Sequence, residues 1–270
     1  MKSLLRDEYG REHLLVGCVH TLALPGAPLY DRAGGMRRVV AQAKEEARIL
    51  EEAGFHALLY TNESDMPYES RVPIETVAAM TDLVAECQAG TTLPHGVNVL
   101  IDPPASVAVA HATGGRFVRA FLTGALAGDI GLMTPDGARA LRLRAQLGAG
   151  SIRIVCNVTP GFSINLDHRP VEAQATGAVF IGLADVVCVG GPAAGKEAEA
   201  SVVERVARAV PDTPVAVGTG VAEENVATLA RFADMFIVGT SIKKDRQTLN
   251  PVDPARARGL VRAYERREAA

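Results

Sequence analysis

The 270-residue sequence predicts an α/β protein built as a (β/α)₈ barrel, the TIM-barrel architecture, with residues 1–270 forming a single domain. Short apolar runs alternate with amphipathic segments eight times along the chain. Such alternation is typical of a parallel sheet, and eight units close into a barrel more readily than they form an open sheet. The composition agrees, because 48% hydrophobic and only 4% aromatic residues give the aliphatic core that a parallel sheet prefers. An open dinucleotide-binding sheet would show GxGxxG after its first strand, whereas this chain has HTLALPG there.

The expected strands are runs rich in Val, Ile and Leu that end in turn residues. They are 14–20, 56–60, 96–100, 117–122, 152–158, 185–189, 215–217 and 235–238, and residues 1–12 form a short extension before the first of them. The expected helices are 36–53, 74–87, a short apolar segment to about 113, 135–147, 171–181, 222–231 and a closing helix from 254. These boundaries follow from apolar residues at near 3.6-residue spacing, from Gly54 after the first helix, and from Pro73 and Pro254 at helix starts.

The charge pattern argues against several classes of partner. The chain has 28 basic and 31 acidic residues, a net charge of −3, and no long block of either sign. Nothing therefore favours nucleic acid or an anionic membrane. The N-terminus is charged throughout and no apolar run approaches the roughly 20 residues of a membrane span, so we expect a cytoplasmic protein without membrane insertion. A homo-oligomer is expected only because symmetric dimers are the commonest soluble assembly.

Two glycine-rich turns near the end of the chain predict a phosphate site. The residues are Gly218, Thr219 and Gly220 after one strand, and Gly239, Thr240 and Ser241 after the next. Turns of this kind free backbone N–H groups, and the helix expected at 222–231 adds the partial positive charge of its N-terminus. In a (β/α)₈ barrel, phosphate binds in the loops after strands seven and eight. A small phosphorylated ligand is therefore the expected partner; the alternative is that the glycines only make tight turns.

Polar residues at the carboxyl ends of barrel strands are the candidates for chemistry. The catalytic candidates are His20, Glu63, Asp65, Asn98 and Arg153. Further rim candidates are Asn62, Asp102, Arg119, Asp129, Asn157 and Lys196.

Each catalytic candidate has a chemical role and a structural alternative. A buried Glu63 or Asp65 would have a raised pKa and could serve as general acid or base, whereas a solvated one would only sit in its loop or cap a helix. Asn98 lies inside GVNVL and needs a partner once buried, so we expect it to face a ligand. Arg153 would hold a second anionic group or a carbonyl oxygen, or else pair with a carboxylate. His20 would orient or polarise the reacting group, or serve only as a hydrogen-bonded structural residue.

No cofactor is predicted, because no flavin, haem or nicotinamide motif occurs in the sequence. A divalent metal would need converging ligands, and His20, Glu63, Asp65 and Asp102 are the only convincing set; we do not expect a metal site. Lysines are scarce and none lies in an expected strand, which disfavours Schiff-base chemistry. Lys196, on a loop, could still reach over a phosphate.

Several segments resemble the BtpA family, which includes SgcQ-type proteins. They are VGCVHTLALPGAP, LEEAGFHALLYTNESDMPY, PIETVAAM, GVNVL, and GTGVAEENVATLARFADMFIVGTSIKKD with NPVD, and the similarity spans about residues 14–262. The resemblance implies a barrel of the ribulose-phosphate-binding kind. One branch of the family is named for a role in photosystem I biogenesis, and the SgcQ branch is associated with sugar metabolism.

The chain departs from the usual family pattern at two strand ends. Where many relatives have DVHVKH after strand five, it has CNVTP at 156–160, and where relatives tend to have TGxxTG after strand six, it has GGPAAG at 190–195. These changes fall on the expected rim and imply a different substrate or an altered activity. The resulting hypothesis is a cofactor-free isomerase, lyase or glycosidic-bond-cleaving enzyme acting on a small phosphorylated sugar-like or nucleotide-derived molecule. The alternative is a non-catalytic assembly factor that uses the barrel as a scaffold.

Overall fold

The computed structural model describes residues 3–266, and its eight parallel strands close into a barrel in the order β1-β11-β10-β9-β7-β4-β3-β2. The predicted (β/α)₈ barrel is confirmed. The barrel strands are β1 (Leu14–His20), β2 (Ala57–Thr61), β3 (His95–Asn98), β4 (Phe117–Ala120), β7 (Arg153–Asn157), β9 (Val186–Val189), β10 (Val215–Val217) and β11 (Met235–Val238). Residues 1–2 and 267–270, the ends of the expected domain, lie outside the described residues.

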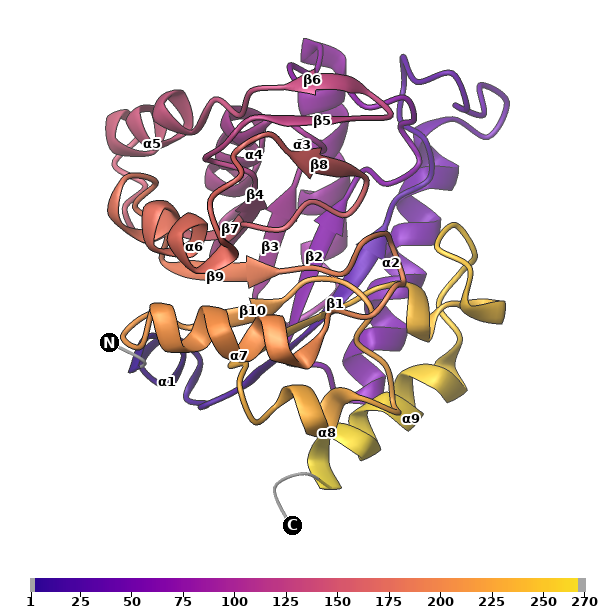
Figure 1. The fold of residues 1–270 in the computed structure, drawn as a ribbon. Helices are drawn as coiled ribbons and strands as arrows, with labels where there is room; N and C mark the ends of the chain where they lie inside the picture. Colours follow the sequence, from indigo (N-terminus) through magenta and orange to yellow (C-terminus); the bar gives the residue numbers. More distant parts are fainter. Residues whose placement is uncertain (1–2, 267–270) are drawn as a thin grey trace.

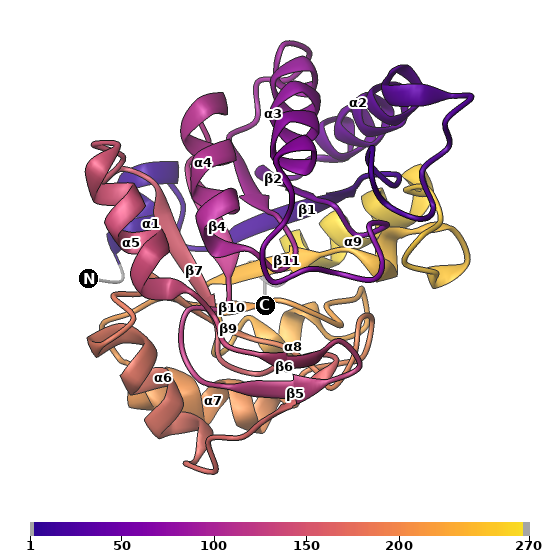
Figure 2. The same ribbon diagram turned by 90° about the horizontal axis from the view of Figure 1, so that it is seen from above.

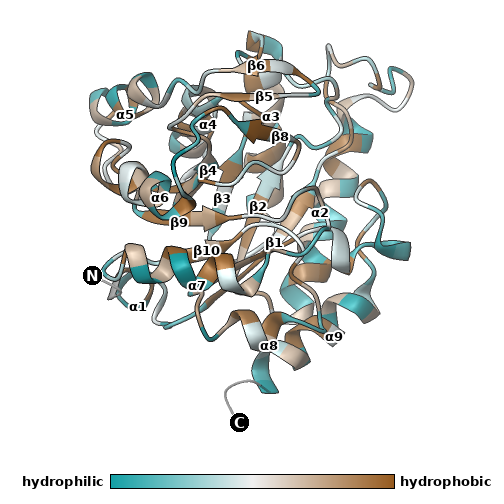
Figure 3. Cartoon of the chain, viewed as in Figure 1, coloured by the Kyte–Doolittle hydropathy of each residue, from teal (hydrophilic) through white to brown (hydrophobic). Residues whose placement is uncertain are grey.

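The helices surround the strands, as Figures 1 and 2 show. They are α1 (Ser3–Tyr9), α2 (Gly35–Ala53), α3 (Ile74–Gln88), α4 (Pro103–Thr113), α5 (Gly137–Gln146), α6 (Val171–Phe180), α7 (Ala200–Ala209), α8 (Val226–Leu229) and α9 (Pro254–Arg266), with short 3₁₀ turns η1 (Thr240–Ile242) and η2 (Lys244–Arg246). Helices such as α7 and α9 alternate between teal and brown in Figure 3, because one face packs on the sheet and the other meets solvent. Among the described residues, no helix is both long and apolar enough to cross a membrane.

One expected helix is much shorter than predicted. Residues 222–231 were expected to be helical, but α8 covers only Val226–Leu229. The reason is the Asn225 side chain, which accepts a bond from the Ala222 N–H at 2.9 Å and donates to the Gly220 carbonyl at 2.9 Å. These bonds hold the preceding residues in a turn, as Asn side chains commonly do. The helix dipole that the phosphate prediction invoked is therefore reduced to about one turn.

A small second sheet, absent from the prediction, lies in the loops after β4 and β7. It joins β6 (Gly131–Met133), β5 (Leu126–Gly128) and β8 (Ser163–Asn165) in antiparallel order, side by side in Figure 1. Each strand has three residues, too few for an alternating pattern to stand out in the sequence. The hairpin turn between β5 and β6 carries Asp129 and Ile130 toward the barrel mouth.

The core has two layers that follow from the pleat of the strands. The larger cluster fills the space between the sheet and the helices. The smaller one fills the barrel interior with residues that include Val16, Leu59, Phe117, Val155 and Ile237. Leu5 of α1 joins the interior cluster, so the N-terminal helix closes the end of the barrel at which the strands begin.

Asp102, expected on the rim, instead caps α4. Its carboxylate accepts the Ala105 N–H at 3.0 Å and the Val72 N–H at 3.0 Å, so it satisfies one end of the helix and fixes the chain before α3. We expect Asp102→Ala to lower the free energy of unfolding in urea by about 1–2 kcal/mol, because both N–H groups lose their acceptor. Asp136 is a matched control, since it precedes α5 without a capping bond; Asp136→Ala should change stability by less than about 0.5 kcal/mol. Equal losses for the two variants would contradict the capping role.

Candidate functional site

A cavity of about 560 Å³ lies at the carboxyl ends of the barrel strands. Its polar lining residues come from the ends of five barrel strands and from two further loops: Glu63, Asn98, Arg119, Asp129, Asn157, Thr159, Thr219 and Thr248. The remaining walls are Met66, Pro67, Tyr68, Leu100, Phe121, Ile130, Gly161, Phe162, Gly190, Ala193, Ala194 and Leu249. The volume is that of a small-molecule site, and the position is the one at which (β/α)₈ barrels hold their ligands.

Glu63 follows β2 and presents its carboxylate to this cavity. Within residues 3–266, no group donates a hydrogen bond to that carboxylate or forms an ion pair with it. Burial raises the pKa of Glu63, while the more distant charges of Arg119 and Lys243 act in the opposite direction. A desolvated carboxyl group without a fixed partner is suited to exchange a proton with a ligand.

Arg119 crosses the top of the barrel interior from β4. Its Nε donates to Asn157 Oδ1 at 3.1 Å, and its Nη2 lies so close to Gly218 that an added Cβ there would be 2.6 Å away. Gly218 is therefore needed to let the guanidinium pass. The result is a fixed positive charge that lines the cavity together with Glu63.

Asn98 ends β3 and is 7% exposed, with its remaining surface in the cavity. In the described part of the chain its side-chain amide has no hydrogen-bond partner, so both its donor and its acceptor are available to a ligand. Asn157, at the end of β7, uses its oxygen for Arg119 and keeps its amide N–H groups for the cavity. Two amides therefore lie beside one carboxyl group and one guanidinium group.

His20 lies at the end of β1 behind Thr248, outside the residues that line the cavity. Burial, aided by Lys243, lowers the pKa of His20 to about 3, so the imidazole is neutral at physiological pH. Its Nδ1 lies 3.2 Å from the Thr248 carbonyl oxygen, which can only accept; Nδ1 therefore carries the proton and Nε2 is an acceptor. An added Cβ at Gly239 would lie 2.9 Å from the ring, which places His20 beside the turn after β11.

Asp65 and Asn62 form a structural network instead of facing the cavity. Asp65 accepts the Leu24 N–H at 2.7 Å and the Asn62 amide at 2.9 Å, and Asn62 in turn accepts the Leu100 N–H at 2.7 Å. Asp65, predicted as the alternative to Glu63 for proton transfer, therefore does not line the cavity. The network joins the loops after β1, β2 and β3 and holds the backbone on either side of Glu63.

Arg153 was expected on the rim, and the structure places it at the opposite end of the barrel. It is the first residue of β7, and its guanidinium pairs with Glu8 of α1 and with Asp185, which lies at 3.4 Å and precedes β9. Arg153 therefore helps to attach α1 to the end at which the strands begin. The cation that reaches the cavity is Arg119.

The two glycine-rich turns lie side by side after β10 and β11. Their hydroxyl groups bind neighbouring loops: Thr219 accepts the Gly191 N–H, Ser241 donates to the Val221 carbonyl at 2.6 Å, and Thr240 bonds to Thr248 at 3.0 Å. Over the described residues, Gly218 is the one residue of these turns whose backbone N–H donates to a protein acceptor; the N–H groups without one are those of Thr219, Gly220, Gly239, Thr240 and Ser241.

The loop after β9 packs against these turns. An added Cβ at Gly220, whose φ is +71°, would lie 2.2 Å from the Lys196 carbonyl oxygen, and one at Gly195 would lie 2.8 Å from the Thr240 side chain. The Lys196 side chain itself is exposed and does not line the cavity. Only Thr219 among the predicted phosphate residues lines the cavity, so a phosphate would approach the free N–H groups past Thr219 and Ala193.

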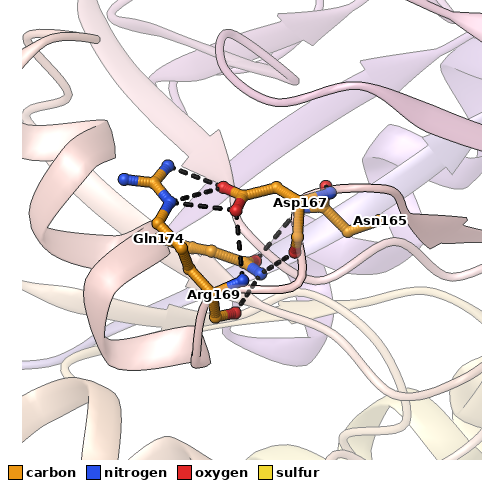
Figure 4. Close-up of polar contacts among 4 residues, drawn as sticks. All are labelled: Asn165, Asp167, Arg169 and Gln174. Carbon is orange, nitrogen blue, oxygen red and sulfur yellow. Dashed lines mark hydrogen bonds and ion pairs between the residues drawn. The ribbon is translucent and has the colours of Figure 1, made fainter.

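A neighbouring hollow of about 310 Å³ shares Phe121 and Asn157 with the main cavity. Its outer wall is a polar cluster shown in Figure 4, in which Gln174 bonds to Asn165 at 3.0 Å and to the Asp167 and Arg169 carbonyls. Asp167 also pairs with the Arg169 guanidinium. The hydrogen-bonding groups of these side chains pair mainly with one another and with the local backbone, and these bonds fix the turn between β8 and α6.

A larger hollow, of about 930 Å³, lies at the other end of the barrel between α1, α7 and the segment before β11. Charged residues of both signs line it, including Arg6, Glu12, Glu204 and Arg208. None of its lining residues lies at the carboxyl end of a strand. In (β/α)₈ barrels, residues at the end where the strands begin contribute to stability and not to catalysis. The smaller cavity around Glu63 is therefore the candidate site.

The structure does not bring the suggested metal ligands together. Asp65 and Asp102 accept backbone N–H groups in different loops, and His20 bonds to Thr248. Within residues 3–266, no group of three His, Cys, Asp or Glu side chains has the arrangement that a metal ion requires.

Sequence reasoning missed several lining residues. Tyr68, Phe162 and Thr159 come from loops beyond the strand ends, where no strand pattern points to them, and Phe121 directly follows β4 but is apolar, so it was not among the polar candidates. It also missed the ion pair of Lys243 with Glu46, in which Nζ lies 2.6 and 2.7 Å from the two carboxylate oxygens.

The fold and the cavity define a (β/α)₈-barrel protein with a cavity at the carboxyl ends of its strands, lined by both polar and apolar side chains. The chain belongs to the BtpA family, whose model matches residues 11–266. It is 36% identical over 254 residues to the putative sgc region protein SgcQ of Escherichia coli K12, covering 94% of this chain and 95% of that protein. It is 30% identical to the photosystem I biogenesis protein BtpA of Synechocystis, covering 92% and 87%. Thiamine phosphate pyrophosphorylase from Pyrococcus furiosus has a similar fold, with a TM-score of 0.57, 14% identity, and 94% and 96% of the two chains covered.

Proposed function

We propose that this protein is a cofactor-free barrel enzyme that acts on a small phosphorylated sugar-like or nucleotide-derived metabolite. The observation that carries the proposal is the Glu63 carboxyl group, which is partly buried and without a partner within residues 3–266, in a cavity shared with Arg119 and Asn98. A purely structural carboxylate in such a place would be paired, because an unpaired buried charge is costly. A catalytic acid or base has to remain free for its substrate.

The roles of the three groups follow from their chemistry. Glu63 transfers the proton, since a raised pKa moves a carboxyl group toward the pH at which it can both give and take one. Arg119 stabilises negative charge that develops on a substrate oxygen, the role that the sequence assigned to Arg153. Asn98 orients the reacting group through its free amide. Isomerisation, lyase cleavage and glycosidic-bond cleavage all use such a set.

The phosphate would lie beside Thr219, against the free N–H groups of the turns after β10 and β11. Backbone N–H groups that converge without acceptors form an anion site even without a long helix. The name of thiamine phosphate pyrophosphorylase, which shares the fold, agrees with a phosphorylated ligand.

A thermal-shift screen tests the phosphate assignment. Inorganic phosphate, ribose 5-phosphate and nucleoside monophosphates are compared with their unphosphorylated counterparts. A ligand at 100 times its Kd should add about 2.7 kcal/mol to stability, which means a rise of a few degrees for a chain of this length. Thr219→Val should lose the shift, whereas Arg153→Gln, at the other end of the barrel, should keep it. Equal shifts with and without phosphate would overturn the assignment.

A second candidate, a non-catalytic assembly role, has one observation in its favour. Phe180, Ile181 and Leu183, at the end of α6, are 78%, 71% and 57% exposed. Neighbouring apolar side chains left in solvent are typical of an interaction surface, and the Synechocystis relative is named for photosystem I biogenesis. An assembly role would tolerate Glu63→Gln, whereas the enzymatic role would not.

A further inference from the structure

The two sides of the cavity differ in chemistry. In the closed barrel, β10 lies opposite β3, and β9 lies opposite β2. The side after β9 and β10 offers small residues and backbone, namely Gly190, Ala193, Ala194 and Thr219. The side after β2, β3 and β4 carries Glu63, Asn98 and Arg119 and, besides them, an apolar wall. That wall is formed by Met66, Pro67, Tyr68, Leu100 and Phe121, with Phe162 and Ile130 from further loops. A ligand with its phosphate on the first side therefore presents its other end to an apolar wall.

Three aromatic rings dominate that wall. Tyr68 and Phe162 have ring centroids 6.3 Å apart, and Phe162 meets Phe121 edge to face at 6.4 Å. The chain has only five tyrosines and seven phenylalanines and no tryptophan, so three rings at one cavity are a concentration. All three are only partly buried. The Tyr68 hydroxyl donates to the Glu63 carbonyl at 2.9 Å, which fixes the position of this ring relative to the proposed proton donor.

The apolar wall disfavours open-chain sugar phosphates, which belong to the proposed substrate class. An open-chain sugar phosphate carries a hydroxyl group on nearly every carbon, and placing these against three aromatic rings would cost hydrogen bonds to water. A planar ring instead gains contact area and stacking. Ring-shaped ligands are therefore favoured over linear polyols.

The amides beside the wall indicate what kind of ring. Asn98 offers a donor and an acceptor, and Asn157 offers a donor, all without protein partners in the described residues. Side-chain amides pair with adjacent donor and acceptor atoms on the edge of a nitrogen heterocycle. A purely hydrocarbon ring would leave them unsatisfied.

We infer that the site takes a phosphorylated compound that carries a planar nitrogen heterocycle, with the ring on the wall of Tyr68, Phe121 and Phe162 and the phosphate beside Thr219. This rests on the proposed function and narrows its substrate class to nucleotide-like molecules. The heterocycle and the phosphate then lie on opposite sides of Glu63 and Arg119, so the bonds between them are the ones within reach of both groups.

The test is a matched set of calorimetric titrations with ribose 5-phosphate, uridine 5′-monophosphate and adenosine 5′-monophosphate. The wild-type protein should bind at least one of the nucleotides roughly 5- to 150-fold more tightly than ribose 5-phosphate, the affinity that one base gains by stacking on an aromatic side chain. Phe162→Ala should remove that advantage and leave the affinity for ribose 5-phosphate unchanged. Phe162→Leu keeps an apolar side chain but has no ring, so it should also remove the advantage while disturbing the loop less than alanine does. Phe180→Ala is the control, because that ring is exposed on α6, outside the cavity.

The outcomes separate this inference from the proposed function. Equal affinities for ribose 5-phosphate and both nucleotides would overturn the ring assignment and leave the phosphate enzyme standing. A nucleotide preference that survives in both Phe162 variants would overturn the aromatic wall as its cause. Absence of binding by all three compounds would overturn the inference together with the phosphorylated substrate class.

Discussion

Replacing Glu63 with glutamine is expected to lower turnover by about 10²- to 10⁴-fold, the usual contribution of a general acid or base, while the fold stays intact. Glutamine has nearly the same shape as glutamate and cannot exchange a proton. The Glu63 carboxylate has no partner to lose within residues 3–266, so the substitution leaves no former partner unsatisfied. The measurement is kcat for the substrate that the ligand screen identifies, alongside the circular dichroism spectrum of the variant. Full activity in Glu63→Gln would sink the assignment and favour the assembly role.

The same variant gives a test that needs no substrate. Because burial raises the pKa of Glu63, the folded protein holds this proton more tightly than the unfolded chain does. The tighter binding of this proton stabilises the folded state. That stabilisation is fully present below the ordinary pKa of a glutamate, about 4.3, and is lost as the pH rises through the pKa of Glu63 in the folded protein. Glutamine does not titrate. The melting temperature of Glu63→Gln relative to the wild type should therefore rise from acid toward higher pH and level off above the folded pKa of Glu63.

Glu69→Gln is the matched control for both measurements, because Glu69 lies in the same loop and is exposed. It should leave both kcat and the melting temperature close to those of the wild type. A Glu63→Gln curve that runs parallel to the wild type across the whole pH range would mean that the carboxyl group is not desolvated.

The fold was predictable because each barrel strand is a run of aliphatic residues closed by a turn. The polar residues that immediately end these runs, such as Asn98 in β3 and Asn157 in β7, lie in the cavity for the same reason. Arg153 shows the limit of the sequence pattern. It lies four residues before Asn157 on one strand, which is roughly 13 Å at about 3.3 Å per residue, so the two cannot share one rim. Strand direction alone was enough to exclude Arg153.

The upper part of the site was not predictable from local sequence. Gly128 pairs with Ser163 in the small sheet above the cavity. Strands of three residues are too short to show an alternating hydrophobic pattern, so the sequence does not predict this pairing. Phe162 reaches the cavity only because that pairing holds its loop over the barrel. The shortening of the helix at 222–231 was also not predictable from periodicity, since the Asn225 side chain bonds to the backbone of Gly220 and Ala222 and holds that segment in a turn.

The Glu46–Lys243 pair was the least predictable feature, because its partners are 197 residues apart. Glu46 lies on α2 and is 2% exposed; Lys243 follows η1 and is fully buried. Glu46 also accepts the Val252 N–H at 3.1 Å. The pair therefore joins the outer helix α2 to the segment that connects β11 to α9.

Removing one partner of this pair is expected to destabilise the protein more than the loss of the Asp102 cap does. Lys243→Met should lower the free energy of unfolding by about 3–5 kcal/mol, because it leaves the Glu46 carboxylate buried without its counter-ion. Denaturation in urea, analysed for both midpoint and slope, measures the loss. Lys244→Met is the matched control, since the neighbouring lysine is exposed, and it should change stability by less than about 0.5 kcal/mol.

The double variant Glu46→Leu with Lys243→Met separates two contributions to the free energy of unfolding: the destabilisation by an unpaired Glu46 carboxylate and the net stabilisation by the ion pair. If the loss in Lys243→Met comes from the unpaired carboxylate, removing that carboxylate as well should recover most of it, as replacing both members of buried pairs by apolar residues often does. A double variant as unstable as Lys243→Met would mean that packing around the Lys243 stem, and not its charge, holds α2 to the segment between β11 and α9. Lys243 also contributes to the low pKa of His20. The pKa of His20, followed by its imidazole resonances in NMR, should therefore rise when Lys243→Met removes the ammonium group.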